Sequence, residues 1–87
     1  KETYQLLVYP NPIQDHVTIT FYLPKESRTS IRLYNVLGQL VSVVMDEIRN
    51  RGAHTMEHPM KNQPAGIYFL LMETGSGRAT ATMIKQE

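Results

Sequence analysis

The chain has 87 residues, a length that corresponds to one small domain with a thin margin of stability. Nine Lys and Arg residues against eight Asp and Glu residues leave a net charge of +1, so the surface gives no electrostatic reason to expect a nucleic acid or an anionic membrane as partner. The absence of cysteine excludes disulfides and thiolate metal sites, and no apolar run approaches the roughly 20 residues that span a bilayer.

The N-terminal part of the chain predicts two strands joined by a rigid corner. Residues 3–9 are β-prone and end at Pro10-Asn11-Pro12, where each proline fixes φ and removes a backbone donor. Gln14 and Asp15 complete the turn. Residues 16–23 alternate strictly, and this period of two predicts that one face enters the core. That face carries Val17, Ile19, Phe21 and Leu23.

A hairpin is predicted over residues 31–45. Its first arm, residues 31–36, alternates with Ile31 and Leu33 on one face. Gly38 permits the positive φ that a tight reversal requires. The second arm, residues 40–45, is apolar and rich in valine, which is typical of a strand buried on both faces.

Three further strands are expected in the C-terminal half. Residues 46–51 lead into a reversal at Asn50 and Gly52, and residues 53–58 are polar enough for an edge strand. Residues 67–73 are apolar on both faces and indicate a central strand. After the turn Gly75-Ser76-Gly77, residues 78–85 form the last strand. Turn signals at this spacing predict an all-β, immunoglobulin-like antiparallel β-sandwich of about seven strands without a disulfide.

No pattern of catalytic or metal-binding residues is evident. His54 and His58 lack a third ligand at strand parity, because Glu57 falls on the other face. None of the serines has a nucleophile elbow, and Asp46 and Glu47 are adjacent and point apart on a strand. We therefore expect neither an enzyme nor a cofactor.

Four blocks of sequence, in order, resemble one known family. They are Val8-Tyr9-Pro10-Asn11-Pro12 followed by Asp15, then residues 31–41 with Tyr34-Asn35 and Gly38, then Pro64-Ala65-Gly66-Ile67-Tyr68, and finally Thr82-Met83-Ile84-Lys85. Together they are similar to the C-terminal sorting domains, type A, of the type IX secretion system of Bacteroidetes. Gln86-Glu87 after the usual terminal lysine is a mild departure.

The resemblance implies that the domain is a sorting signal carried by a secreted cargo protein. It implies recognition by the outer-membrane translocon and its shuttle protein, and in many cargoes removal by a sortase-like cysteine peptidase that joins the cargo to anionic lipopolysaccharide. The cargo would cross the periplasm and then reach the cell surface or the medium. The chain starts at Lys1 rather than Met, so we expect one domain, residues 1–87, cut from a larger protein, with any signal peptide upstream. Self-association is left open.

The resemblance also supplies the candidate recognition residues. These are Tyr9, Pro10, Asn11, Pro12, Asp15, Gly38, Pro64, Gly66, Tyr68, Thr82, Ile84 and Lys85. We hypothesise a recognition surface on residues 80–85 together with residues 66–68, through side chains or by pairing with an edge strand. For Gly38, Pro64 and Gly66, turn geometry is an equally good explanation of the family pattern. The alternative function is an immunoglobulin-like accessory module that binds carbohydrate or a partner protein, or an uncleaved docking domain at the cell surface.

Overall fold

The computed structural model describes residues 5–75 and 77–87, which form seven β-strands. The strands are β1 (Gln5–Tyr9), β2 (His16–Leu23), β3 (Ser27–Asn35), β4 (Leu40–Arg49), β5 (Gly52–Pro59), β6 (Gly66–Thr74) and β7 (Gly77–Lys85). Three residues of the predicted elements, Thr3, Tyr4 and Ser76, lie outside the described part of the chain. Within that part, no helix has the length and apolar character needed to cross a membrane.

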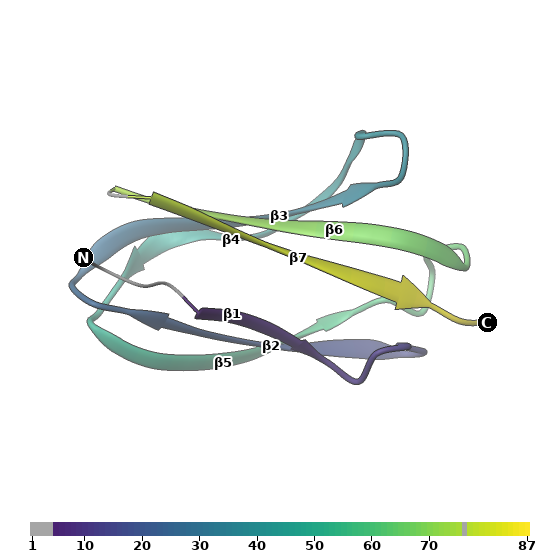
Figure 1. The fold of residues 1–87 in the computed structure, drawn as a ribbon, viewed down its shortest axis with the longest axis horizontal. Coiled ribbons are helices and arrows are strands. Elements are labelled where there is room, and N and C mark those ends of the chain that lie inside the picture. Colours follow the sequence, from purple (N-terminus) through teal and green to yellow (C-terminus); the bar gives the residue numbers. More distant parts are fainter. Residues whose placement is uncertain (1–4, 76) are drawn as a thin grey trace.

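The strands form two antiparallel sheets that stack face to face (Figure 1). One sheet has the order β1-β2-β5 and the other the order β4-β3-β6-β7. β1 contacts β7 at one seam between the sheets. At the other seam, Ser42 Oγ of β4 lies 3.2 Å from His58 Nε2 of β5. The predicted β-sandwich is therefore confirmed.

The core lies between the sheets and is filled by alternating apolar side chains. The predicted face of β2 is fully inside, and β3 and β6 cover it from the other sheet. Full burial of a large aliphatic or aromatic side chain contributes roughly 1.5–3 kcal/mol, so these strands carry most of the stability. Ile13 and Met60 close the core from two loops. The buried strand residues include Val17, Ile19, Phe21, Leu23, Ile31, Leu33, Leu70 and Met72.

β4 differs from the prediction made for residues 40–45. It was expected to be buried on both faces, but it is an edge strand in which Leu40 is 52% and Val43 50% exposed. The prediction was wrong because β-branched composition reports a preference for strand geometry, whereas burial depends on which strands pair and which faces are covered. β4 also continues through Asp46 to Arg49, where the sequence predicted the approach to a reversal.

The prediction of an edge strand at residues 53–58 and the prediction of a central strand at residues 67–73 are confirmed. β5 is an edge strand and pairs with β2. β6 lies between β3 and β7, as its apolar sequence indicated. Only one face of β6 is buried, however, because within residues 5–75 and 77–87 no second layer covers the outer face of this sheet. Ile67 and Phe69 are therefore partly exposed there.

One end of the sandwich collects four loop segments. They are residues 10–15, 36–39 and 60–65, and residues 86–87 after β7, all at the right of Figure 1, where the C-terminus is marked. We call this end the C-terminal pole. The remaining turns, after β2, β4 and β6, lie at the opposite pole, as the alternating strand directions require.

Candidate functional site

The Pro-Asn-Pro corner attaches the start of the chain to β7. The Asn11 side chain accepts a hydrogen bond from the Ile84 amide at 3.0 Å and donates one to the Thr82 carbonyl at 3.4 Å. The Ile13 amide donates to the Ile84 carbonyl, and the Gln86 amide donates to the Ile13 carbonyl, both at 2.8 Å. The chain thus leaves the three-stranded sheet after Tyr9 and bridges in parallel to Lys85 of the other sheet. The outer edge of β7 is closed along its C-terminal half.

The N-terminal half of β7 keeps an open edge. Along an antiparallel strand, alternate residues direct both backbone groups to the same side. The backbone N–H and C=O groups of Ile84 point away from β6, so those of Thr80 and Arg78 do as well. Among the described residues, no backbone hydrogen bond outside the strand ladders reaches either of them. This stretch is therefore unpaired among the described residues, although β1 contacts β7 at this seam.

The β3–β4 turn is built by Asn35. Its Oδ1 accepts hydrogen bonds from the amides of Leu37 (2.9 Å) and Gln39 (3.0 Å), and its Nδ2 donates to Gln39 Oε1 at 2.9 Å. Gly38 has a φ of +80°, as the predicted reversal requires. The turn presents Val36 and Leu37 to solvent, with Leu37 78% exposed. Asn35 is a structural residue that the candidate list missed, although it lies within the resembling block.

The segment before β6 is fixed by Tyr68. Its ring is buried, and its hydroxyl donates a 2.6 Å hydrogen bond to the Pro64 carbonyl. This contact has the form of the tyrosine corner of immunoglobulin-like sandwiches. Burial raises the pKa of the Tyr68 phenol, so it stays a neutral donor. Gly66, with a φ of +152°, lets the chain enter β6.

These two segments enclose a cleft at the C-terminal pole. The cleft has a volume of about 250 Å³ and is lined by the β3–β4 turn, by Val41 and by residues 63–68. Its walls include the exposed side chains of Leu37 and Ile67, the latter 44% exposed. We call it the apolar cleft. Ile67 pairs with Ile84 of β7, which is also exposed, so the apolar surface continues onto the outer face of the four-stranded sheet.

A second cleft, which we call the lysine cleft, adjoins the first. It has a volume of about 360 Å³ and shares Gln63, Pro64 and Ala65 with the apolar cleft. Lys85 lines it and is only 7% exposed, with its Nζ donating a 3.0 Å hydrogen bond to the Gln86 carbonyl. The remaining lining residues are Gln14, Asp15, Lys61 and Glu87.

The structure therefore gathers the candidate residues at one end, but in two groups. Tyr9, Pro10, Asn11, Pro12, Thr82 and Ile84 lie along the junction of the first corner with β7. Asp15, Pro64, Gly66, Tyr68 and Lys85 line the two clefts. Gly38 shapes the β3–β4 turn but lines neither cleft. Ile13 was missed, and its only signal was an apolar residue inside a polar corner.

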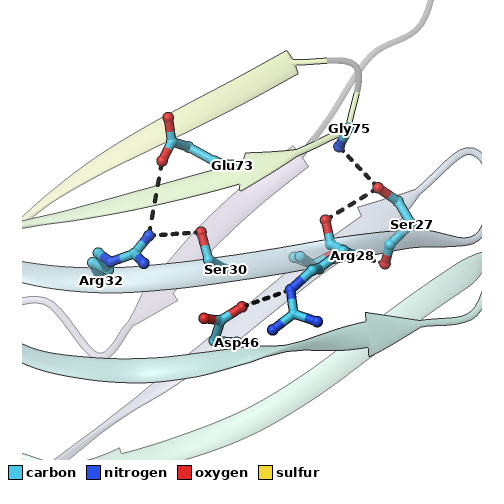
Figure 2. Close-up of polar contacts among 8 residues, drawn as sticks. Ser27, Arg28, Ser30, Arg32, Asp46, Glu73 and Gly75 are labelled. Carbon is cyan, nitrogen blue, oxygen red and sulfur yellow. Dashed lines mark hydrogen bonds and ion pairs between the residues drawn. The ribbon is translucent and has the colours of Figure 1, made fainter.

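The opposite pole carries polar contacts on the outer face of the four-stranded sheet (Figure 2). Arg28 Nε lies 3.2 Å from Asp46 Oδ1, and Arg32 Nη1 lies 3.0 Å from Ser30 Oγ and 3.8 Å from Glu73 Oε1. The Gly75 amide donates to Ser27 Oγ at 2.9 Å. Exposed ion pairs of this kind contribute at most about 1 kcal/mol each. Apart from the exposed Ile48, polar and charged side chains therefore predominate on this surface, whereas exposed aliphatic side chains line the apolar cleft at the C-terminal pole.

The histidines form no shared site. His16 Nε2 lies 3.8 Å from Glu57, the His54 ring stacks on Phe21 with centroids 5.0 Å apart, and His58 contacts Ser42. Across residues 5–75 and 77–87, no three His, Cys, Asp or Glu side chains are grouped closely enough to hold a metal ion.

Comparisons with known proteins bear on both the fold and the four blocks. A solved structure described as dimeric latent PorU from Porphyromonas gingivalis matches with a TM-score of 0.68 and 14% identity, over 94% of this chain and 9% of that chain. At this identity the match supports the fold alone. The comparison with curated proteins found no match. The family model described as the secretion system C-terminal sorting domain matches residues 7–86, which include all four blocks. The chain therefore belongs to the family of secretion system C-terminal sorting domains, the sorting signals of type IX secretion.

Proposed function

We propose that the type IX translocon recognises this domain at its C-terminal pole. Family membership makes the chain a signal for export across the outer membrane to the cell surface or the medium. The observation that supports the pole as the recognition surface is the meeting of all four blocks there, the second and third of them around an open apolar cleft. Exposed apolar surface that is rimmed by polar groups is typical of a protein-binding site.

The domain acts in this pathway as ligand and substrate and performs no catalysis itself. The cargo passes through the periplasm, where the shuttle protein and the translocon bind the folded domain. A sortase-like cysteine peptidase then removes the domain and joins the cargo to anionic lipopolysaccharide. The family match supports the existence of a reader, since a sorting signal requires one, and the individual steps are part of the proposal.

Recognition through side chains is better supported than pairing with an edge strand. Asn11 and Ile13 occupy the outer edge of β7 from Thr82 to Gln86. A partner strand would first have to displace this corner, or would have to bind beside Thr80. The proposed recognition surface therefore consists of the exposed side chains of residues 80–85 and 66–68 and of the apolar cleft.

Several motif residues act through the shape of the pole. Gly38 provides the left-handed turn, Gly66 the entry into β6, and Pro64 the carbonyl that holds Tyr68. We propose that these three residues present the surface and that the exposed neighbours Leu37 and Ile67 make the contacts.

Export of a fusion protein tests the proposed route. A reporter with an N-terminal export signal and this domain at its C-terminus is expressed in a type IX-competent Bacteroidetes host and in a translocon-deficient strain. We expect the reporter outside the cell only in the competent host. If a folded fusion stays in the periplasm of both strains, the sorting function is refuted and the accessory binding module replaces it. Deletion of residues 80–87 is a poor test, because it removes the fully buried Met83 and would unfold the domain.

A further inference from the structure

Lys85 is a buried cation that uses one of its three donors within the described part of the chain. It lies on the inward-facing side of β7 and is 7% exposed. A lysine ammonium has three donors, and one of them is bonded to the Gln86 carbonyl. None of the ion pairs formed within residues 5–75 and 77–87 involves Lys85. A charge removed from bulk water without an opposite charge is unfavourable, so the site favours an anion.

The lysine cleft gives an anion access to this amine. It is about 360 Å³ in volume, and Lys61, Gln14 and Gln63 add further donors around Lys85. The acidic residues on the lining, Asp15 and Glu87, are both exposed. Their charges are screened by water, whereas the buried Lys85 acts through a medium of lower dielectric. The lining carries two lysines and two acidic residues, and Lys85 is the buried one among them, so we expect the cleft to favour an anion at Lys85.

The neighbouring apolar cleft indicates what kind of molecule carries the anion. The two clefts share the wall formed by Gln63, Pro64 and Ala65. On the far side of that wall, Leu37 and Ile67 expose aliphatic surface. A free phosphate or a sugar headgroup has no aliphatic group to bury against that surface. A polypeptide with an aliphatic residue close to a carboxylate has groups that match both clefts.

We propose that the lysine cleft binds the carboxylate of an Asp or Glu side chain of a protein partner, and that the apolar cleft binds an aliphatic side chain of the same partner segment. This inference rests on the proposed function, because it takes the reader of the signal as the partner. These two contacts are the means by which that reader binds the C-terminal pole. The charged hydrogen bond gives specificity, and the aliphatic contact adds apolar burial.

A peptide titration tests the chemistry directly. The probes are acetyl-Gly-Leu-Glu-Gly-amide and its isosteric neutral counterpart, acetyl-Gly-Leu-Gln-Gly-amide. They are titrated into the 15N-labelled chain while the amide resonances are followed. We expect the Glu peptide to shift the Lys85, Ala65 and Ile67 amides in a saturable way, and the Gln peptide to bind roughly ten- to a hundredfold more weakly, as expected for loss of a charged hydrogen bond. Lys85→Met is expected to remove this difference, while Lys25→Met, at the opposite pole, preserves it.

Three results would overturn the proposal. The first is equal binding of the Glu and Gln peptides, and the second is no shift at roughly 10 mM peptide, above the range of weak single contacts. The third is that methyl phosphate binds as tightly as the Glu peptide, which would assign the cleft to a headgroup. The two peptides are compared on the unchanged chain, so the test holds even if Lys85→Met fails to fold. A domain that is exported normally but does not discriminate between the peptides refutes this inference and leaves the proposed function intact.

Discussion

Replacement of Asn11 by alanine isolates the role of the first corner in holding β7. The change removes the 3.0 Å bond to the Ile84 amide and the 3.4 Å bond to the Thr82 carbonyl. The second bond is longer than the usual range and contributes little. Both backbone groups regain water at this exposed edge, so no burial penalty follows. We therefore expect a loss of about 1 kcal/mol in the free energy of unfolding.

Hydrogen exchange is the sensitive assay for this loss, because it is local. About 1 kcal/mol corresponds to a roughly fivefold fall in protection, which is the most that we expect for β2 amides that exchange by global unfolding. A larger fall is expected at the Ile84 amide, which also loses its acceptor, and at the Gln86 amide on the same edge. Asn50→Ala is the matched control, since Asn50 lies in the turn after β4 at the opposite pole. Unchanged protection of Ile84 in Asn11→Ala, or an equal fall throughout the chain, would refute the assignment of Asn11 as the clamp on β7.

Three other changes test the C-terminal pole and the second seam. Tyr68→Phe keeps the buried ring but leaves the Pro64 carbonyl without its donor, and we expect urea denaturation to show a loss of roughly 1–2 kcal/mol. Gly38→Ala meets no atom within 4 Å yet places a side chain at a φ of +80°, so we expect it to lose about 1 kcal/mol by the same assay. Burial lowers the pKa of His58 below the usual histidine value of 6.5, so the unfolded chain binds more protons between the two pKa values. The contribution of His58 to stability is complete above the unfolded pKa and is lost as the pH falls through the lower folded pKa, and His58→Gln is expected to flatten this part of the stability–pH curve.

Each of these has a clear contrary result. Wild-type stability of Tyr68→Phe would mean that water replaces the hydroxyl, and wild-type stability of Gly38→Ala would mean that the turn relaxes freely. An unchanged pH slope in His58→Gln would assign the acid sensitivity to other groups.

The sequence predicted the parts of the fold that depend on local pattern. The alternation of residues 16–23 placed Val17 and Ile19 in the core correctly, because only one pairing register buries that face. Composition misjudged β4, since its valines promote a strand equally well at an edge. The edge position is a property of strand order, which no local window contains.

The residues of the candidate site also divide into those with a local sequence signal and those whose role depends on distant parts of the chain. Turn residues such as Gly38 were identified because each has a local conformational signature. The bonds from Asn11 to β7 span 71 and 73 residues of sequence and have no local signature. The alternation of residues 78–85 puts Lys85 on the same face as Met83, but that a charged residue would be buried there was not predicted from the sequence, and the lining of the lysine cleft by residues 61 and 63–65 beside it has no local signature.

The central claim is that the C-terminal pole is the surface that is read, and a pair of matched substitutions tests it most directly. Ile67→Thr and Ile48→Thr each replace an exposed β-branched residue on the outer face of the four-stranded sheet, with exposures of 44% and 62%, the first beside the apolar cleft and the second near the opposite pole. The exported fraction of the fusion is measured for both variants in the competent host, after equal melting temperatures are established. We predict a fall in export for Ile67→Thr and wild-type export for Ile48→Thr. Equal export of the two variants would contradict recognition at the pole.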